Sequence, residues 1–167
     1  ISSGAYASAA VANSYTALAA NLQLSGSLTL SSAGYAVDLS AITSGSGGFS
    51  VTNTGASAQI TGSALKDYLI GGQNSDTLIG GAGNDTLNGG DGVDFLYGDE
   101  GNDTMNGGDS PDSMLGGDGD DVMDGGNGRN WLYGELGNDT MTGGDDVDIM
   151  YGGDGNDTLD GGLGDDD

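Results

Sequence analysis

The sequence predicts an all-β solenoid, a fold in which short repeats stack along one axis. Three observations predict it: a strict repeat of nine residues, an apolar residue at a fixed place in each repeat, and glycine-rich turns between short β-prone stretches. In the register that begins at Gly71, ten nine-residue units run to Asp160 without insertion or deletion, and a fragment follows them. Self-similarity of this strictness outweighs any local signal in the chain.

Two positions of the unit carry the pattern. The sixth position is acidic in all units but one, and reads Asp76, Asp85, Asp94, Asp103, Asp112, Asp121, Asn130, Asp139, Asp148, Asp157 and Asp166. The eighth position is always Leu or Met, and reads Leu78, Leu87, Leu96, Met105, Met114, Met123, Leu132, Met141, Met150 and Leu159. Because side chains alternate along a strand, an apolar eighth position predicts an inward-facing core with outward-facing seventh and ninth positions.

The apolar beat continues upstream of the glycine-rich units. It passes at nine-residue steps through Leu69, Ile60, Val51 and Ile42. The stretches FSVTN and AQITG in this region are β-prone, although the acidic turn residues are missing. We therefore predict neutral Ser/Thr/Gly-rich coils over 35–61 and acidic coils over 62–167, with the boundary set by a change in chemistry.

The first residues, 1–34, are predicted to form a helix with capping or linker strands. Val11, Tyr15 and Leu18 fall on one helical face within 5–20, and serines at the start supply an N-cap. A short amphipathic helix here would close the open end of the solenoid. A linker, or the last element of a neighbouring domain, explains the segment equally well.

The charged composition of the chain indicates what kind of partner it binds. The chain has 167 residues, with 26 acidic and two basic side chains and a formal net charge of −24. Such a charge on a chain with few aromatic residues predicts disorder unless something neutralises it. Nucleic acid is excluded as a partner because phosphate recognition needs clustered Lys and Arg. Polyvalent cations are the natural counter-charge.

The residue types that are missing argue against catalysis. The chain has no Cys and no His, so it lacks thiol nucleophiles, disulfides and imidazole acid–base groups. The HExxH, GxSxG and GK[ST] patterns are also absent. We therefore expect a non-catalytic segment.

We also expect no membrane span, since no apolar run approaches ~18 residues. An Ala-rich start without a basic flank is not typical of a signal peptide. The last unit stops at GGLGDDD, so we expect a piece of a longer protein.

The pattern Gly-Gly-x-Gly-x-Asp-x-apolar-x resembles the repeats-in-toxin (RTX) nonapeptide, closely over 71–167 and loosely over 62–70. The resemblance implies a right-handed parallel β-roll. In that family six residues form a turn that holds Ca²⁺ and three form a short strand, so two units make an 18-residue coil. Glycine permits the turn conformations, and Ca²⁺ prefers six to eight oxygen ligands.

The resemblance also implies where the ions bind. Each Ca²⁺ lies between turns 18 residues apart and takes backbone carbonyls from the first four positions and two sixth-position carboxylates. The pairs expected on one edge are Asp85/Asp103, Asp103/Asp121, Asp121/Asp139 and Asp139/Asp157, and those on the other are Asp76/Asp94, Asp94/Asp112 and Asp148/Asp166. The expected glycine site residues are Gly80, Gly81, Gly83, Gly98, Gly101, Gly116, Gly117, Gly119, Gly134, Gly137, Gly152, Gly153 and Gly155.

About eight ions would remove about two-thirds of the charge. Asn130 interrupts the second edge, and Arg129 beside it is either a fixed substitute for an ion or a solvated surface residue. The competing explanation, that Asp and Gly merely cap tight turns, is disfavoured. Carboxylates stacked ~4.8 Å apart without cations would repel one another.

Alternate units differ in their outward positions. One set has Thr, Asn and Asp there, apart from Val122, whereas the other predicts an apolar contact face of Phe95, Tyr97, Leu115, Trp131, Tyr133, Ile149 and Tyr151. Contiguous exposed apolar surface indicates a contact site. Another part of the parent protein, self-association or another protein partner would cover it. Carbohydrate is the weakest alternative, because no clear set of polar orienting groups accompanies the aromatic residues.

These observations predict a calcium-dependent structural module of a secreted or cell-surface bacterial protein. The resemblance implies type I secretion, with folding outside the cell on calcium binding. The neutral upstream coils and the contact face favour a surface-layer (S-layer), adhesin or matrix parent. The alternative is the folding and secretion domain of a secreted enzyme or toxin.

Overall fold

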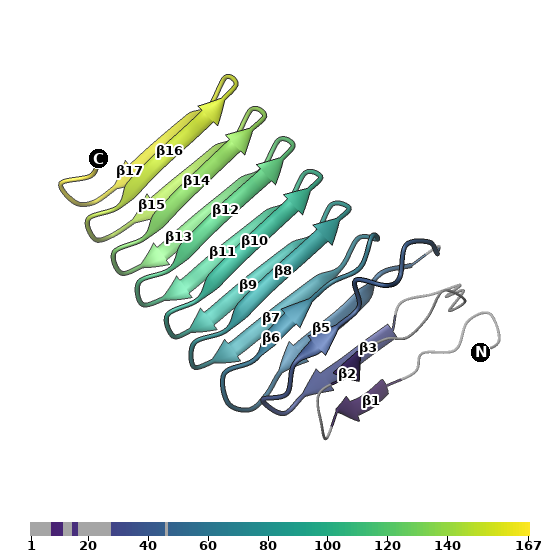
Figure 1. Ribbon diagram of the computed structural model, residues 1–167. Coiled ribbons are helices and arrows are strands. Elements are labelled where there is room, and N and C mark those ends of the chain that lie inside the picture. The colour runs from purple at the N-terminus through teal and green to yellow at the C-terminus, as the bar shows by residue number, and fades with distance from the viewer. Residues whose placement is uncertain (1–7, 12–14, 17–27, 46) are drawn as a thin grey trace.

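The protein is a parallel β-solenoid formed by two sheets that face each other (Figure 1). The computed structural model describes residues 8–11, 15–16, 28–45 and 47–167. Odd-numbered strands form one sheet of nine strands and even-numbered strands form a second sheet of eight. The chain passes alternately from one sheet to the other, so each strand pairs with the strand two before it and the strand two after it.

All strand pairs are parallel, and the strands are short. The odd-numbered sheet consists of β1 (Ser8–Val11), β3 (Leu28–Ser32), β5 (Phe49–Asn53), β7 (Tyr68–Gln73), β9 (Thr86–Asp91), β11 (Thr104–Asp109), β13 (Val122–Asn127), β15 (Thr140–Gly144) and β17 (Thr158–Gly162). The even-numbered sheet consists of β2 (Tyr15–Thr16), β4 (Val37–Asp38), β6 (Gln59–Thr61), β8 (Thr77–Ala82), β10 (Phe95–Glu100), β12 (Ser113–Asp118), β14 (Trp131–Leu136) and β16 (Ile149–Asp154).

The pairing register gives the coil length. From β5 and β6 onward each residue lies beside the residue 18 positions away, as Leu96 does beside Leu78 and Met114. This confirms the 18-residue coil for the repeat region. The coil is longer upstream, where Thr29 pairs with Ser50 and Val37 pairs with Ile60. Loops without the Gly-Asp turn add these extra residues. The right-handed sense of the coil stays a prediction.

The eighth-position side chains form the core. They stack in two inner columns, one per sheet, and Leu78 to Met141 are each almost fully buried. Met150 is partly buried, and Leu159 in the last coil is 42% exposed. The upstream beat is also confirmed, because Leu69, Ile60 and Val51 continue the same columns. Ile42 is buried too, but it lies in a loop where its N–H donates to Leu39 O.

Strands in the repeats are twice as long as the resemblance implies. β10, for example, includes Phe95, Leu96 and Tyr97 and then the first three residues of the next unit. Only the fourth to sixth positions remain as the turn, as in Gly101, Asn102 and Asp103. The turns are therefore tight, and their sixth residue lies directly before the next strand.

The predicted N-terminal helix is wrong for the part of it that the structure describes. Ser8–Val11 and Tyr15–Thr16 are strands that pair with β3 and β4. The rest of 5–20 lies outside the described residues. Helical periodicity is a weak prior, and backbone pairing with the exposed strands of the first coil overrides it here. The described residues also contain no helix long and apolar enough to cross a membrane.

Candidate functional site

The turns bring the sixth-position side chains into two buried columns, one along each edge of the solenoid. Every described turn from Asp76 to Asp148 places this side chain inward, with an exposed fraction of 0–1%. One column contains Asp67, Asp85, Asp103, Asp121, Asp139 and Asp157, and the other contains Asp76, Asp94, Asp112, Asn130, Asp148 and Asp166. Asp157 and Asp166, in the last coil, are less buried.

Each side chain of a column is held by the backbone of the coil before it. The Asp85 N–H donates to Asp103 Oδ1 at 2.7 Å, and the Asp103 N–H donates to Asp121 Oδ1 at the same distance. The same bond recurs along both columns at 2.7–3.0 Å. This bond fixes one oxygen of each carboxylate, and it thereby also fixes the direction in which the second oxygen of the same carboxylate points.

That second oxygen accepts no hydrogen bond within the described residues. The buried and unpartnered atoms are Oδ2 of Asp76, Asp85, Asp94, Asp103, Asp112, Asp121, Asp139 and Asp148. A buried anionic oxygen without a donor carries a large desolvation penalty, so buried polar atoms nearly always have partners. A repeated set of such oxygens fits a cation that binds hard oxygen ligands.

The first glycine of each unit faces these oxygens. A Cβ on Gly98 would lie 2.4 Å from both Asp103 Oδ2 and Gly116 O, and one on Gly116 would lie 2.3 Å from Asp121 Oδ2 and 2.7 Å from Gly134 O. Glycine therefore leaves the space in which a carboxylate and a carbonyl of the next coil approach. Carboxylates and backbone carbonyls are the ligands that Ca²⁺ takes in proteins.

Across the described residues, no three acidic side chains converge in a cluster that would hold a metal ion by themselves. An ion in a column would thus take carboxylates from neighbouring coils and complete its shell with carbonyls. That is the arrangement which the sequence resemblance implies. The role of the individual Asp and Gly residues as ligands stays a prediction.

Burial makes these carboxylates poor anions in the absence of a cation. Desolvation raises the pKa of Asp85, Asp112 and Asp121 to about 7, with neighbouring carboxylates adding to the rise. It raises the pKa of Asp94 to about 6. The backbone N–H bonds oppose the shift but do not cancel it, so at neutral pH a bound cation would relieve a real cost.

The comparisons with known proteins agree with this geometry. The family described as RTX calcium-binding nonapeptide repeat matches four segments, 61–96, 70–105, 97–132 and 133–167, which together cover more than half of the chain. The chain belongs to the RTX calcium-binding repeat family. The RTX repeats make it a calcium-binding structural module. No curated protein and no solved structure matches it in the other two comparisons.

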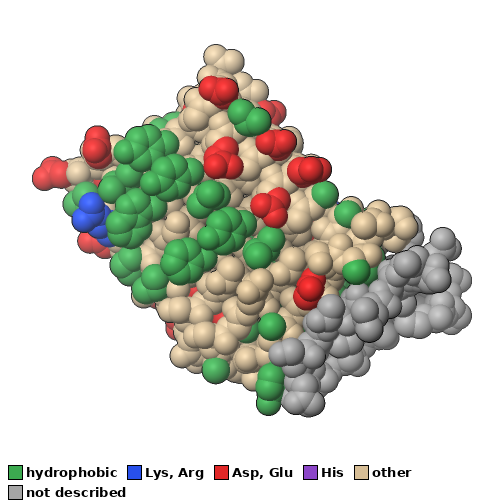
Figure 2. Space-filling model, viewed as in Figure 1, with side chains coloured by type: hydrophobic (Ala, Val, Ile, Leu, Met, Phe, Trp, Pro, Cys, Tyr) green, Lys and Arg blue, Asp and Glu red, His purple; other side chains and the backbone are tan. Residues whose placement is uncertain are grey.

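The predicted contact face lies on the outer side of the even-numbered sheet of this RTX roll (Figure 2). Phe95 and Tyr151 are 45% and 55% exposed, and the other five residues of the face are half-buried. Register places Tyr97, Leu115, Tyr133 and Tyr151 in one column. The rings of Tyr133 and Tyr151 stack with centroids 5.3 Å apart.

Arg129 is part of this outer face. Its guanidinium carbon lies 5.4 Å from the centroid of the Trp131 ring, and its side chain is exposed. A cation over an indole face is attracted by the ring quadrupole. The structure therefore does not favour Arg129 as a substitute for an ion inside the turn beside Asn130.

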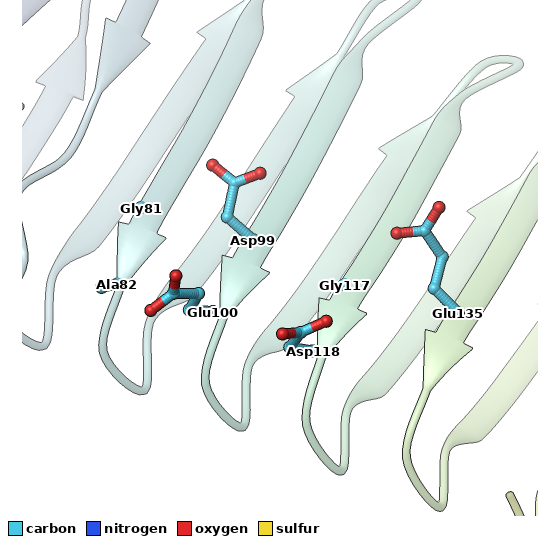
Figure 3. Close-up of a pocket in the computed structure, with 7 residues that line it drawn as sticks. All are labelled: Gly81, Ala82, Asp99, Glu100, Gly117, Asp118 and Glu135. Carbon is cyan, nitrogen blue, oxygen red and sulfur yellow. The ribbon is translucent and has the colours of Figure 1, made fainter. Parts of the chain in front are cut away.

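Sequence reasoning missed an acidic groove next to the contact face (Figure 3). Asp99 and Glu135 project from β10 and β14 on either side of Gly117, with Glu100 and Asp118 nearby. Both Asp99 and Glu135 have positive φ angles, of 71° and 76°. In the sequence, Asp99 and Glu135 stand where most units have their second glycine, and this departure could have revealed the groove. Asp99 and Glu135 place carboxylates two residues beyond Tyr97 and Tyr133. The sequence analysis disfavours carbohydrate because it finds no clear set of such polar groups beside the aromatic residues.

Proposed function

We propose that this RTX module is a calcium switch for folding: unfolded where calcium is scarce, and folded on export where calcium is plentiful. The observation that carries the proposal is the set of eight buried carboxylate oxygens without a hydrogen-bond donor. A calcium-free roll must desolvate these groups, whereas calcium compensates them. Secretion through a type I system is the route that the RTX repeats favour.

The energy of calcium binding is large enough for a switch. A site with a Kd of ~10⁻⁴ M stabilises the folded state by about 1.4 kcal/mol at ~1 mM free calcium. About eight independent sites of this kind would supply about 11 kcal/mol, comparable to the whole stability of a domain. Removing calcium therefore suffices to unfold the roll.

Calcium removal tests the proposal directly. Far-UV circular dichroism of the chain in excess EDTA is expected to lose the β signal contributed by residues beyond about 62. Millimolar Ca²⁺ should restore the signal, and Mg²⁺ at the same concentration should not, because it demands near-ideal octahedral geometry. A spectrum unchanged by chelation at neutral pH would refute the folding switch.

We further propose a surface-layer, adhesin or matrix protein as the parent. The neutral coils that precede the acidic ones and the outer contact face support this role. A secreted enzyme or toxin that uses the roll for folding and export is the alternative. An HExxH or lipase-type motif elsewhere in the open reading frame would favour the alternative, and further Ser/Thr-rich β repeats would favour the surface protein.

We propose that the segment itself is non-catalytic. Each buried carboxylate of the two columns has one oxygen fixed by a backbone N–H of the preceding coil. This arrangement suits a ligand more than an acid–base catalyst, which needs a cleft that admits a substrate. The histidine-free composition supports the same conclusion.

The contact face is proposed to mediate assembly, either with a neighbouring domain or with another copy. The triple change Phe95→Ser, Trp131→Ser and Tyr133→Ser is expected to weaken association in analytical ultracentrifugation of the full parent protein while calcium-induced folding persists. The matched control is Thr104→Ser, Asn106→Ser and Thr140→Ser on the outer side of the odd-numbered sheet. Equal association of the two triple variants would eliminate the interface.

A further inference from the structure

Asn130 differs from every other sixth-position side chain of the buried columns. Its Oδ1 accepts the N–H of Asp112 at 2.9 Å, as the carboxylates of the other coils do. Its second terminal atom is a nitrogen, which donates to Gly128 O at 2.8 Å and lies within 3.5 Å of Gly143 O. This atom has partners, whereas Oδ2 of both neighbours in the column, Asp112 and Asp148, has none.

The amide nitrogen takes the place that the unpartnered oxygen has elsewhere. A Cβ on Gly125 would meet Asn130 Nδ2 at 2.7 Å and Gly143 O at 2.6 Å. One coil earlier, a Cβ on Gly107 would meet Asp112 Oδ2 at 2.5 Å and Gly125 O at 2.6 Å. The two sixth-position side chains thus lie in equivalent places and differ in one terminal atom, an oxygen in Asp112 and a nitrogen in Asn130. At Asn130 that atom is a nitrogen, which donates hydrogen bonds directly to backbone carbonyl oxygens.

The orientation of the Asn130 amide is fixed by its surroundings. Turning the amide over would place its NH₂ group against the N–H of Asp112, so that two donors would face each other in a buried place. The observed orientation satisfies both ends of the side chain. A calcium ion here would have to displace the NH₂ group from Gly128 O and lie beside the positive end of the amide dipole.

We infer that the Asn130 turn is an ion-free rung of the RTX roll, in which the side-chain amide does the work that calcium does in the other turns. The inference rests on the proposed calcium-binding function and adds an assignment of occupancy to it. The carboxylate pairs that would include position 130 are not built. Ions on this edge therefore fall into two groups, one around Asp76, Asp94 and Asp112 and one at Asp148 and Asp166.

The start of the calcium columns shows the same chemistry. Asp67 Oδ1 accepts the Phe49 N–H, and its Oδ2 accepts both the N–H and the hydroxyl of Ser63, at 2.6–2.8 Å. No unpartnered oxygen remains on Asp67. On the other edge, the Asn53 amide donates to Ala56 O at 2.7 Å and to Asp76 Oδ1 at 3.0 Å. Protein donors thus satisfy both oxygens of Asp67 at the start of one column, whereas at the start of the other they reach only Oδ1 of Asp76 and leave its Oδ2 without a donor.

The test changes an amide turn into a carboxylate turn and, in a second variant, a carboxylate turn into an amide turn. Asn130→Asp supplies the carboxylate that its neighbours have, and native mass spectrometry with isothermal titration in saturating calcium should show about one or two more ions per chain than the natural sequence. The reverse change, Asp121→Asn on the uninterrupted edge, places an amide where Gly119 O and Gly134 O lie. It should remove about one or two ions and leave the chain folded in calcium.

The outcomes separate this inference from the proposed function. If the natural sequence binds no calcium, the proposed function fails. If the natural sequence binds calcium and Asn130→Asp binds the same number of ions, the ion-free rung is refuted while the switch stands. Should Asn130→Asp fail to fold, Asp121→Asn decides: an unchanged ion count in that variant overturns the inference, and a reduced count supports it.

Discussion

Single side chains set how far the protein itself satisfies each buried carboxylate of this roll. A sixth-position Asp has one oxygen bound to the backbone N–H of the coil before it and a second oxygen that depends on what else is near. Ser63 supplies donors for Oδ2 of Asp67, whereas Oδ2 of the eight buried carboxylates from Asp76 to Asp148 has no donor among the described residues. The repeat predicted the inward carboxylates, but it did not reveal Ser63, because a serine at the second position looks like an ordinary departure from glycine.

Removing the Ser63 hydroxyl should therefore weaken the start of the calcium columns. In Ser63→Ala, Asp67 Oδ2 keeps the backbone N–H of residue 63 and loses the hydroxyl at 2.8 Å. Loss of a hydrogen bond to a buried charged group costs about 1–3 kcal/mol. Urea unfolding in saturating calcium measures the change. Ser50→Ala, on the outer side of β5, is the control, and equal stability of the two variants would contradict the assignment.

The inward face of each strand is predicted well where the repeat is strict, although the strands are longer than expected, and strands are predicted poorly where the repeat is absent. The inward columns from Leu78 to Met141 follow from the nine-residue period alone, because an apolar residue at a fixed strand position has only one face to occupy. The period could not show that β1 replaces a helix, since pairing with β3 is a long-range contact. It also could not give the 21-residue step between Thr29 and Ser50, which loops create.

The tight turn that follows β10 depends on glycine at its first residue, Gly101. Gly101 has a φ of +127°, and a Cβ there would lie 1.9 Å from Gly83 O in the neighbouring coil. Gly101→Ala should destabilise the calcium-bound roll by at least about 1–2 kcal/mol from backbone strain alone, with the steric clash added. Calcium titration followed by circular dichroism is expected to show a higher midpoint than for Thr104→Ala, an outward change on the following strand. Coincident midpoints would argue against a strained turn.

At the scale of the whole molecule, stacking turns every 18 residues concentrates negative charge inside two narrow columns. The net charge of −24 is thus only partly a property of the surface. At the proposed calcium sites, protons and calcium would compete for the same buried oxygens, because either one removes the cost of an uncompensated carboxylate. The two ligands should consequently stabilise the roll in opposite ranges of pH.

The calcium-free roll should be more stable in mild acid than at neutral pH. The folded-state pKa is raised to about 7 for Asp85, Asp112 and Asp121 and to about 6 for Asp94, whereas the ordinary Asp value is 3.8. The folded state therefore binds more protons than the unfolded state between these values. The resulting stability is fully present below pH 3.8 and is lost as pH rises through 6 to 7.

Circular dichroism in EDTA tests this reversal. Dilute chelated protein is expected to keep more β signal at pH 5 than at pH 8, while protein in millimolar Ca²⁺ keeps its signal at pH 8. Calcium affinity measured by titration should fall as pH drops from 8 to 5, since protons must leave before the ion binds. A chelated chain that is equally unfolded at both pH values, together with a calcium affinity independent of pH, would show that buried carboxylates do not control folding.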